Sequence, residues 1–255
     1  MQELYNKILE LVKKNNACAM ATVVSSAGSA PRHIGAKMVV SGDGALMGTI
    51  GGGGLEKLVI ADCLVALKRK KSFLKDYPLD KKSGLQVCGG KVSIFIDVIR
   101  AQKTLLIAGA GHIGLALSFI AKLLNFRVII LDNRREFAHK IRFPHVDKII
   151  CSPYAEAFKK LVLKKDTFVV IVTHGHVHDA ECLEAALRTK AGYIGMIGSR
   201  AKIKHVFGGL RKKGFKKAQL AKVYTPVGLD ISAETPEEIA VAIAAQLVQV
   251  SKQAP

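Results

Sequence analysis

Residues 105–132, LLIAGAGHIGLALSFIAKLLNFRVIILD, constrain the fold of this chain more than any other segment. Gly109, Gly111 and Gly114 stand between an apolar run and a predicted helix. The first glycine permits a tight turn, the second lets the backbone approach a diphosphate, and the third allows the helix to pack closely on the strand. The first N–H groups of a helix have no partner within it and can bind an anion. The segment therefore predicts the first strand, glycine turn and helix of a Rossmann-like unit.

A second apolar segment, 127–131, ends in Asp132, about 20 residues beyond the glycines. In dinucleotide-binding folds, a carboxylate at this position accepts hydrogen bonds from a ribose diol. The order of strand, helix, second strand and acid therefore favours a bound nucleotide. The glycines are also compatible with close strand-to-helix packing and no ligand, because a fold does not specify a function.

From residue 105 onward, predicted strands and helices alternate. The strands are expected at 105–109, 127–131, 148–151, 167–173 and 192–197, and the helices near 112–124, 153–164, 178–189 and 199–213. This alternation is typical of a doubly wound parallel sheet with helices on both faces. A last helix follows Thr235, which can cap it, and Glu238 can complete a capping box. Its buried stripe is predicted at Ile239, Ile243, Leu247 and Val250.

The N-terminal part of the chain has a different pattern. The expected elements are an amphipathic helix at 1–15, a strand at 17–25, a hairpin formed by 37–41 and 45–50, a helix near 55–70, and strand character at 86–99. The polar stretch 100–103 is the predicted domain boundary. The expected fold class is α/β, with an N-terminal mixed α/β domain at 1–100 and a Rossmann-like, doubly wound parallel-sheet domain at 101–255.

Composition narrows the class of protein. No segment approaches the roughly 20 uncharged apolar residues of a membrane span, so we expect a cytoplasmic protein with no membrane partner. The five cysteines are scattered without a C-x-x-C pair, which favours reduced thiols. A net charge of +19 is compatible with attraction to phosphates, with an acidic partner or with a solvated lysine-rich surface. Aromatic residues are few and no nucleic-acid-binding module is present, so we favour the solvated surface and expect no nucleic-acid partner.

Two glycine clusters in the N-terminal part could bind an anion. Residues 28–32 read Gly-Ser-Ala-Pro-Arg, and Gly51, Gly52, Gly53 and Gly54 stand directly before a predicted helix. Consecutive N–H groups at a helix start form an anion-binding nest, and Arg32 could bind a phosphate through two hydrogen bonds. The same residues are equally compatible with two tight turns in a mixed sheet.

Cys88 is followed by Gly89 and Gly90. Glycines beside a thiol leave the sulfur sterically open and allow close backbone approach, as a metal-centred or sulfur-bearing ligand requires. A cysteine at a strand end is more often a small buried apolar side chain, and the spacing by itself favours that interpretation.

Three histidines, His174, His176 and His178, follow the predicted strand 167–173, at the edge where open α/β sheets bind ligands. Alternating imidazoles can converge on a metal. However, Asp179 comes after the third histidine, and the surrounding pattern differs from that of metallo-β-lactamase-type hydrolases. We therefore favour histidines that line a cofactor cleft or begin a helix, with Asp179 as an N-terminal charge and no metal site.

The segment 195–200, GMIGSR, ends the last predicted strand and opens a basic helix. The hydroxyl of Ser199, the guanidinium of Arg200 and the local N–H groups are expected to face the same cleft as Gly111, which suits an anionic ligand. A simple helix cap by Ser199 is equally compatible with the spacing.

In this order, the clusters resemble the xanthine dehydrogenase accessory protein family, which includes the carbon monoxide dehydrogenase maturation factors. The matching segments are GSAPRHIGAKMVV, GTIGGGGLE, VCGGKVSIFIDV, LLIAGAGHIGLAL, THGHVHD, YIGMIGSRAKI and TPVGLDISAETPEEIAVAI. They span nearly the entire chain, and their combination is much more specific than any one of them. The chain departs from the family at Ser232, where the resemblance implies a glycine. The residue order of its three-histidine segment, THGHVHD, is also unusual for the family.

The resemblance implies a cofactor-carrying maturation factor with little or no turnover of its own. Such a protein binds molybdenum cofactor (molybdopterin) and assists its sulfuration and insertion into an apo-molybdenum hydroxylase such as xanthine dehydrogenase. A cysteine desulfurase is the implied sulfur donor, and a homodimer is the implied assembly. By the same resemblance, Cys88 contacts the molybdenum or its sulfur ligand, and Arg32 with residues 51–54 holds the pterin or its phosphate. The remaining expected cofactor-binding residues are Gly89, Gly90, Gly109, Gly111, His112, Gly114, Asp132, His174, Ser199 and Arg200.

Two other functions are compatible with parts of the sequence. An NAD(P)-dependent oxidoreductase would use the Rossmann-like domain, with His112 or His174 as proton donor. The absence of a Tyr-x-x-x-Lys pair beside the glycine motif weakens this alternative. A metal-dependent hydrolase would use His174, His176 and His178.

Overall fold

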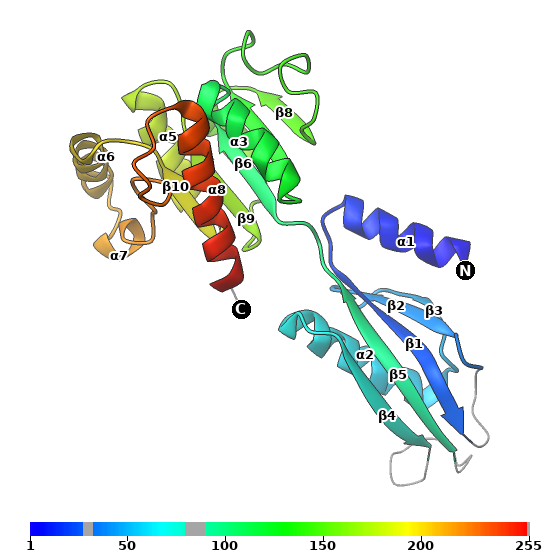
Figure 1. The fold of residues 1–255 in the computed structure, drawn as a ribbon. Helices are drawn as coiled ribbons and strands as arrows, with labels where there is room; N and C mark the ends of the chain where they lie inside the picture. The colour runs from blue at the N-terminus through cyan, green and yellow to red at the C-terminus, as the bar shows by residue number, and fades with distance from the viewer. Residues whose placement is uncertain (28–32, 80–89, 254–255) are drawn as a thin grey trace. The chain divides into compact units, whose positions relative to one another are not determined.

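The computed structural model describes residues 1–27, 33–79 and 90–253, and the chain divides into two compact units, 1–102 and 103–255. The elements of the N-terminal unit are α1 (Gln2–Lys13), β1 (Cys18–Ala27), β2 (Lys37–Ser41), β3 (Leu46–Gly48), α2 (Gly53–Arg69), β4 (Phe73–Leu79) and β5 (Gly90–Ile99) (Figure 1). Those of the C-terminal unit are β6 (Thr104–Ala108), α3 (His112–Leu123), β7 (Arg127–Asp132), β8 (Lys148–Cys151), α4 (Tyr154–Lys160), β9 (Thr167–Ile171), α5 (His176–Leu187), β10 (Tyr193–Met196), α6 (Arg200–Lys212), α7 (Lys217–Leu220) and α8 (Pro236–Gln253).

The N-terminal unit is built on an antiparallel sheet of order β3-β2-β1-β5-β4. Side chains alternate between the two faces of a strand, so Ala19 and Ala21 of β1 point toward the same core. Val59 and Cys63 of α2 pack into that core, whereas α1 packs with Val39 in a second cluster. The predicted mixed α/β architecture and the hairpin of β2 and β3 are confirmed.

Strand β4 is an element that the sequence pattern did not reveal. It lies at the edge of the sheet and pairs with β5 alone in the described residues, with Leu74 opposite Phe95. Lys75 and Asp76 are exposed, and Pro78 cannot donate to a strand ladder. Such residues are tolerated at an edge, where one side of the strand faces solvent, and they conceal the strand pattern.

The C-terminal unit contains a parallel sheet of order β10-β9-β6-β7-β8. This order is that of a Rossmann-like unit, with the connection reversing direction between β6 and β9. Every residue of β6 and of β9 is buried, which explains why both read as continuous apolar runs rather than as alternating patterns. The predicted doubly wound parallel sheet is confirmed.

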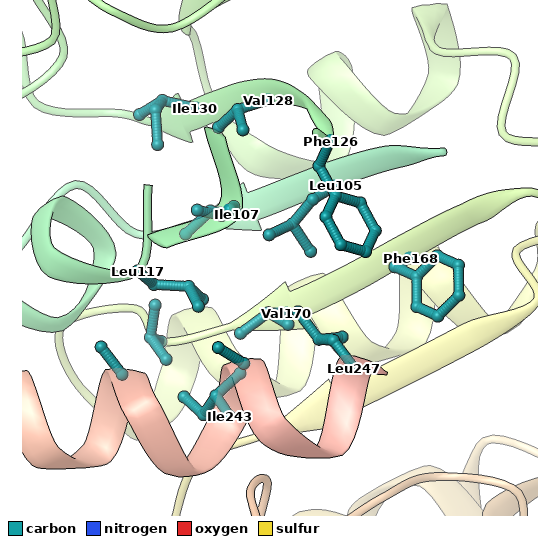
Figure 2. Packing of buried hydrophobic residues seen from close by; sticks show 14 of the residues in the cluster. Leu105, Ile107, Leu117, Phe126, Val128, Ile130, Phe168, Val170, Ile243 and Leu247 are labelled. Carbon is teal, nitrogen blue, oxygen red and sulfur yellow. The ribbon is translucent and has the colours of Figure 1, made fainter. Parts of the chain in front are cut away.

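Helices cover both faces of this sheet. Leu105 and Ile107 of β6 face a core that includes Leu117 of α3 together with Ile243 and Leu247 of α8 (Figure 2). The alternate β6 residues Leu106 and Ala108 face a separate core, to which α4, α5 and α6 contribute. In the predicted stripe of α8, Ile243 and Leu247 are fully buried, while Ile239 and Val250 are partly buried against the same core.

The start of α8 contains the predicted capping box. Glu238 N donates to Thr235 Oγ1 at 3.2 Å, and Thr235 N donates to Glu238 Oε2 at 3.0 Å. Several predicted helix boundaries differ from the structure by two residues or more, and two of them have a clear local cause. Helix α4 ends before Leu161, which has extended backbone angles, and α5 begins at His176, directly after Gly175 with φ 91°. Among the described residues, we find no helix with the length and apolar character needed to cross a bilayer.

Candidate functional site

The turn between β6 and α3 uses its glycines in two different ways. A Cβ on Gly109, where φ is +124°, would lie 2.2 Å from the Val172 carbonyl oxygen, and one on Gly114 would lie 2.0 Å from the Gly109 carbonyl oxygen. A Cβ on Gly111 would meet no atom within 4 Å. The tight turn predicted at Gly109 and the close helix packing predicted at Gly114 are confirmed, whereas Gly111 borders open space at the start of the helix.

This open space lies at the positive end of α3. Gly111 is the N-cap residue, and His112, the first helical residue, is exposed. The first N–H groups of a helix find no carbonyl partner within it, and the helix dipole places partial positive charge at the same end. The turn can therefore receive an anion through its backbone, and ligand binding at Gly111 and His112 stays a prediction.

Asp132 has a different role from the predicted one. Its side chain is fully buried, its Oδ2 accepts from Ala110 N at 2.7 Å, and its Oδ1 accepts from Arg134 N at 3.0 Å. The Arg134 guanidinium also donates to both carboxylate oxygens, each at 2.9 Å. Burial raises the pKa of Asp132, but the hydrogen bonds from Arg134 and Ala110 outweigh it, so the pKa lies below its ordinary value. Asp132 thus fixes the Ala110 turn and presents no free carboxylate to a ribose diol.

Two further arginines, which belong to none of the sequence motifs, lie beside this turn. Arg142 Nε donates to the Ala110 carbonyl oxygen at 3.3 Å. The guanidinium carbons of Arg134 and Arg142 lie 4.0 Å and 5.5 Å from the centroid of the Phe137 ring, in cation–π contact. The signal for them was the basic segment NRREFAHKIRF directly after the second strand. The charge of Arg134 is balanced by its pair with Asp132, so Arg142 supplies the net positive charge that suits a phosphate at the glycine turn.

A buried ion pair links the loops that follow β9 and β10. Asp179 of α5 is fully buried, accepts a hydrogen bond from Thr173 Oγ1 at 2.5 Å, and pairs with Lys202 of α6. The Lys202 side chain is 12% exposed, and its Cδ lies 2.8 Å from where a Cβ on Gly198 would be. The sequence placed Asp179 at the helix start, where it lies, but did not identify its partner.

Of the three histidines, the described side chains of His174 and His178 form no metal-binding arrangement, and the side chain of His176 lies outside the described part of the chain. His174 is exposed, and the ring of His178 lies 5.3 Å from that of Tyr154, with Nδ1 3.5 Å from Glu181 Oε2. Among the residues described, no group of three or more His, Cys, Asp or Glu side chains is placed to hold a metal. The hydrolase alternative therefore gains no support from the described residues of this loop.

Ser199 caps α6, accepting a hydrogen bond from Lys202 N at 3.3 Å, and Arg200 beside it is exposed. Both residues border a cavity of about 510 Å³ that is also lined by Gly198, by residues 226–233 and by Ile239 of α8. Another cavity, of about 620 Å³, is lined by α4, α5 and the chain between α4 and β9. None of its lining residues belongs to the loops after β6, β9 or β10.

The glycine run before α2 forms a nest that an acid of the chain occupies. Ile50 N and Gly52 N donate to Glu56 Oε1 at 3.1 Å and 2.9 Å, and the Thr49 hydroxyl donates to the same oxygen. Burial raises the pKa of Glu56, but these hydrogen bonds outweigh it and lower the pKa. Gly51 N donates to Thr49 Oγ1 at 3.2 Å. The expected anion site therefore needs correction, because the N–H groups of Gly51 and Gly52 are used internally. Only Gly53 and Gly54, both exposed, remain at the helix start.

Several predicted residues lie outside the described part of the chain, namely Arg32, Cys88 and Gly89. Gly90 is the first residue of β5 and pairs with Leu79. The four described cysteines are free thiols, as expected: Cys18, Cys63 and Cys182 are buried, and Cys151 is exposed.

Two family models match the sequence. One, described as the XdhC Rossmann domain, matches residues 105–247, and the other, described as the XdhC and CoxI family, matches residues 11–78. The chain is 35% identical over 256 residues to the uncharacterized protein YqeB of Escherichia coli strain K12, covering 99% of this chain and 47% of that protein. It is 30% identical over 161 residues to a probable xanthine dehydrogenase subunit of Bacillus subtilis strain 168, covering 63% of this chain and 47% of that protein.

A crystal structure described as a xanthine dehydrogenase from Bacillus halodurans aligns with 98% of this chain and 96% of its own, with a TM-score of 0.56 and 23% identity. At that identity, the likeness supports the fold alone. The chain spans just under half the length of the two curated relatives.

Proposed function

Because this chain belongs to the XdhC and CoxI family, we propose that it serves the maturation of a molybdenum hydroxylase of the xanthine dehydrogenase type. In this role the molybdenum cofactor is cargo. The protein binds it, presents it for sulfuration by a cysteine desulfurase and delivers it to the apo-hydroxylase, with no turnover of its own. A homodimer is part of the same proposal.

The observation that carries the proposal is the open glycine turn of the C-terminal unit. Gly111 leaves space for a ligand at the start of α3, where N–H groups and the helix dipole favour an anion. Arg142, whose Nε donates to the Ala110 carbonyl oxygen, adds positive charge at the same turn. The phosphate of a pterin cofactor is an anion of the kind that such a turn binds.

The geometry weakens the oxidoreductase alternative in its NAD-dependent form. A bound NAD requires a carboxylate at the end of the second strand for its ribose diol, and Asp132 already accepts hydrogen bonds at both oxygens. Arg142, which makes no ion pair among the described residues, is suited to a phosphate instead. The relevant competitor for the cargo is therefore NADPH.

A pair of glycine variants tests cargo binding at the turn. Gly111→Ala is expected to reduce the transfer of molybdenum cofactor from the purified protein to an apo-hydroxylase, measured as recovered hydroxylase activity, because the methyl group occupies the space that the phosphate needs. Gly208→Ala, on α6, is the matched control, since its Cβ would also meet no atom within 4 Å. Equal transfer by both variants would contradict binding at this turn.

Cys88 tests the sulfuration part of the proposal. Cys88→Ala is expected to abolish transfer of the sulfurated cofactor while leaving the circular dichroism spectrum unchanged, and Cys151→Ala, which removes an exposed thiol, is the control. Hydride transfer from tightly bound NADPH, together with full transfer activity of Cys88→Ala, would favour an oxidoreductase.

A further inference from the structure

The cavity of about 510 Å³ in the C-terminal unit is lined by two sequence motifs that are not part of the glycine turn. One wall comes from residues 197–200, between β10 and α6, and the other from residues 226–233. Ile239 and Ala242 of α8 close the space between them. The volume lies within the roughly 300–1,000 Å³ typical of small-molecule sites.

Buried hydrogen bonds hold the 226–233 wall in place. Gln246 of α8, 9% exposed, accepts from Gly228 N and donates to Gly228 O, both at 3.1 Å. Tyr193 Oη donates to the same Gln246 oxygen at 2.5 Å, and Leu229 N donates to Ala242 O at 3.1 Å. Because these partners belong to β10 and α8, the wall is part of the folded core and the cavity is formed before any ligand arrives.

The lining combines three kinds of chemistry. Ile197, Val227 and Ile239 supply apolar surface for the faces of a ring. At one side, the first N–H groups of α6 and the guanidinium of Arg200 favour a phosphate. Asp230 supplies a carboxylate, and it makes no ion pair with any residue that the structure describes, although the chain carries a net charge of +19.

We propose that this cavity binds a fused pyrimidine ring that carries neighbouring amino and ring N–H groups and an attached phosphate. The two donors point in one direction and match the two oxygens of the Asp230 carboxylate, while the apolar residues cover the ring faces. Guanine nucleotides and pterin phosphates share this donor edge, and adenine lacks it. The pterin source rests on the proposed function and would make this cavity a second binding position for the cargo, in addition to the Gly111 turn. The recognition of the donor edge stands on the cavity.

Direct binding to the full-length protein tests the inference without an apo-hydroxylase. Calorimetry with GMP, neopterin phosphate, AMP and inorganic phosphate is expected to show binding of the first two, with AMP and phosphate weaker by roughly tenfold or more. Whichever of GMP and neopterin phosphate binds more tightly identifies the ring as guanine or pterin. Equal affinity for GMP and AMP, or binding no tighter than that of inorganic phosphate, overturns the proposal.

Asp230→Asn is expected to weaken the binding of GMP and neopterin phosphate by roughly tenfold or more and to leave AMP binding unchanged. Glu3→Gln, which removes one exposed negative charge from α1, is the control and is expected to change neither. Asp230 is exposed, so its variant should fold, which the melting temperature checks. Unchanged GMP affinity in Asp230→Asn overturns the assignment. Failure of cofactor transfer with ring binding intact would count against the proposed function and leave this site standing.

Discussion

At the scale of single residues, one methyl group should have different effects at two glycines of the β6–α3 turn. Gly114→Ala places a Cβ 2.0 Å from the Gly109 carbonyl oxygen, so strand and helix must separate. We expect the free energy of unfolding to fall by roughly 2–4 kcal/mol. Gly111→Ala, which meets no atom within 4 Å, should change it by less than about 0.5 kcal/mol. Urea denaturation of both variants measures the difference, and equal stabilities would show that the turn relaxes freely.

Ser232 offers a second residue-scale prediction. Its φ is 57°, a left-handed conformation that costs a non-glycine residue roughly 1–2 kcal/mol. Ser232→Gly relieves this cost, while the added freedom of the unfolded chain removes about 0.4–1 kcal/mol of the gain. The melting temperature of Ser232→Gly should therefore equal or slightly exceed that of the parent, and Ser232→Val should melt lower. A clear loss of stability in the glycine variant would contradict this. The same backbone angle explains why the family resemblance implies glycine here.

At the scale of elements, the Asp179–Lys202 pair connects α5 to α6, and its burial makes it sensitive to loss of one partner. Lys202→Met leaves the fully buried Asp179 uncompensated, and we expect a loss of about 3–5 kcal/mol in the free energy of unfolding. Adding Asp179→Asn to that variant should restore part of the loss. The control is Lys213→Met, at the C-terminal end of α6, because Lys213 is 62% exposed and its pair with Glu184 should contribute no more than about 1 kcal/mol. Similar losses in the two single variants would contradict a dominant role for burial.

Sequence patterns predicted the helices and strands better than they predicted which side chains bind one another. The apolar runs of β6 and β9 and the capping box of α8 follow local rules, and these elements lie where the sequence places them. Strand β4 was not predicted, because an edge strand tolerates charged residues and proline, which obscure the strand pattern. The partners of Asp132 and Lys202 could not be read from spacing, because a motif shows which groups can bind an anion and not which side chain of the folded chain already does.

At the scale of the whole molecule, stability should fall with acidity in two stages. Burial, with Lys122 and Lys140 nearby, lowers the pKa of His145 below its ordinary value of 6.5. The neutral form is therefore favoured in the folded state, and its contribution is complete above about pH 6.5 and is lost as pH falls below that value. The pKa values of Asp132 and Glu56 are also lowered, so their contributions are present above about pH 4 and are lost as pH falls further.

Urea midpoints of the full chain between about pH 8 and pH 3 test this prediction. We expect a small decline below about pH 6.5 that His145→Gln removes, and a steeper one below about pH 4 that Asp132→Asn makes shallower. The growing positive charge adds to the second decline, since the chain already carries +19 at neutral pH. A constant midpoint down to pH 3 would contradict the lowered pKa values.

A chain with a net charge of +19 attracts anions, and the backbone N–H groups of the glycine run 51–54 before α2 would bind them if they were free. The nest instead holds Glu56, an acid tethered four residues from Gly52, which donates a hydrogen bond to it. A free phosphate must displace a group whose effective local concentration is very high. The N–H groups of Ile50 and Gly52 are therefore closed to abundant small anions, whereas the turn at Gly111 borders open space and can receive phosphate-bearing molecules.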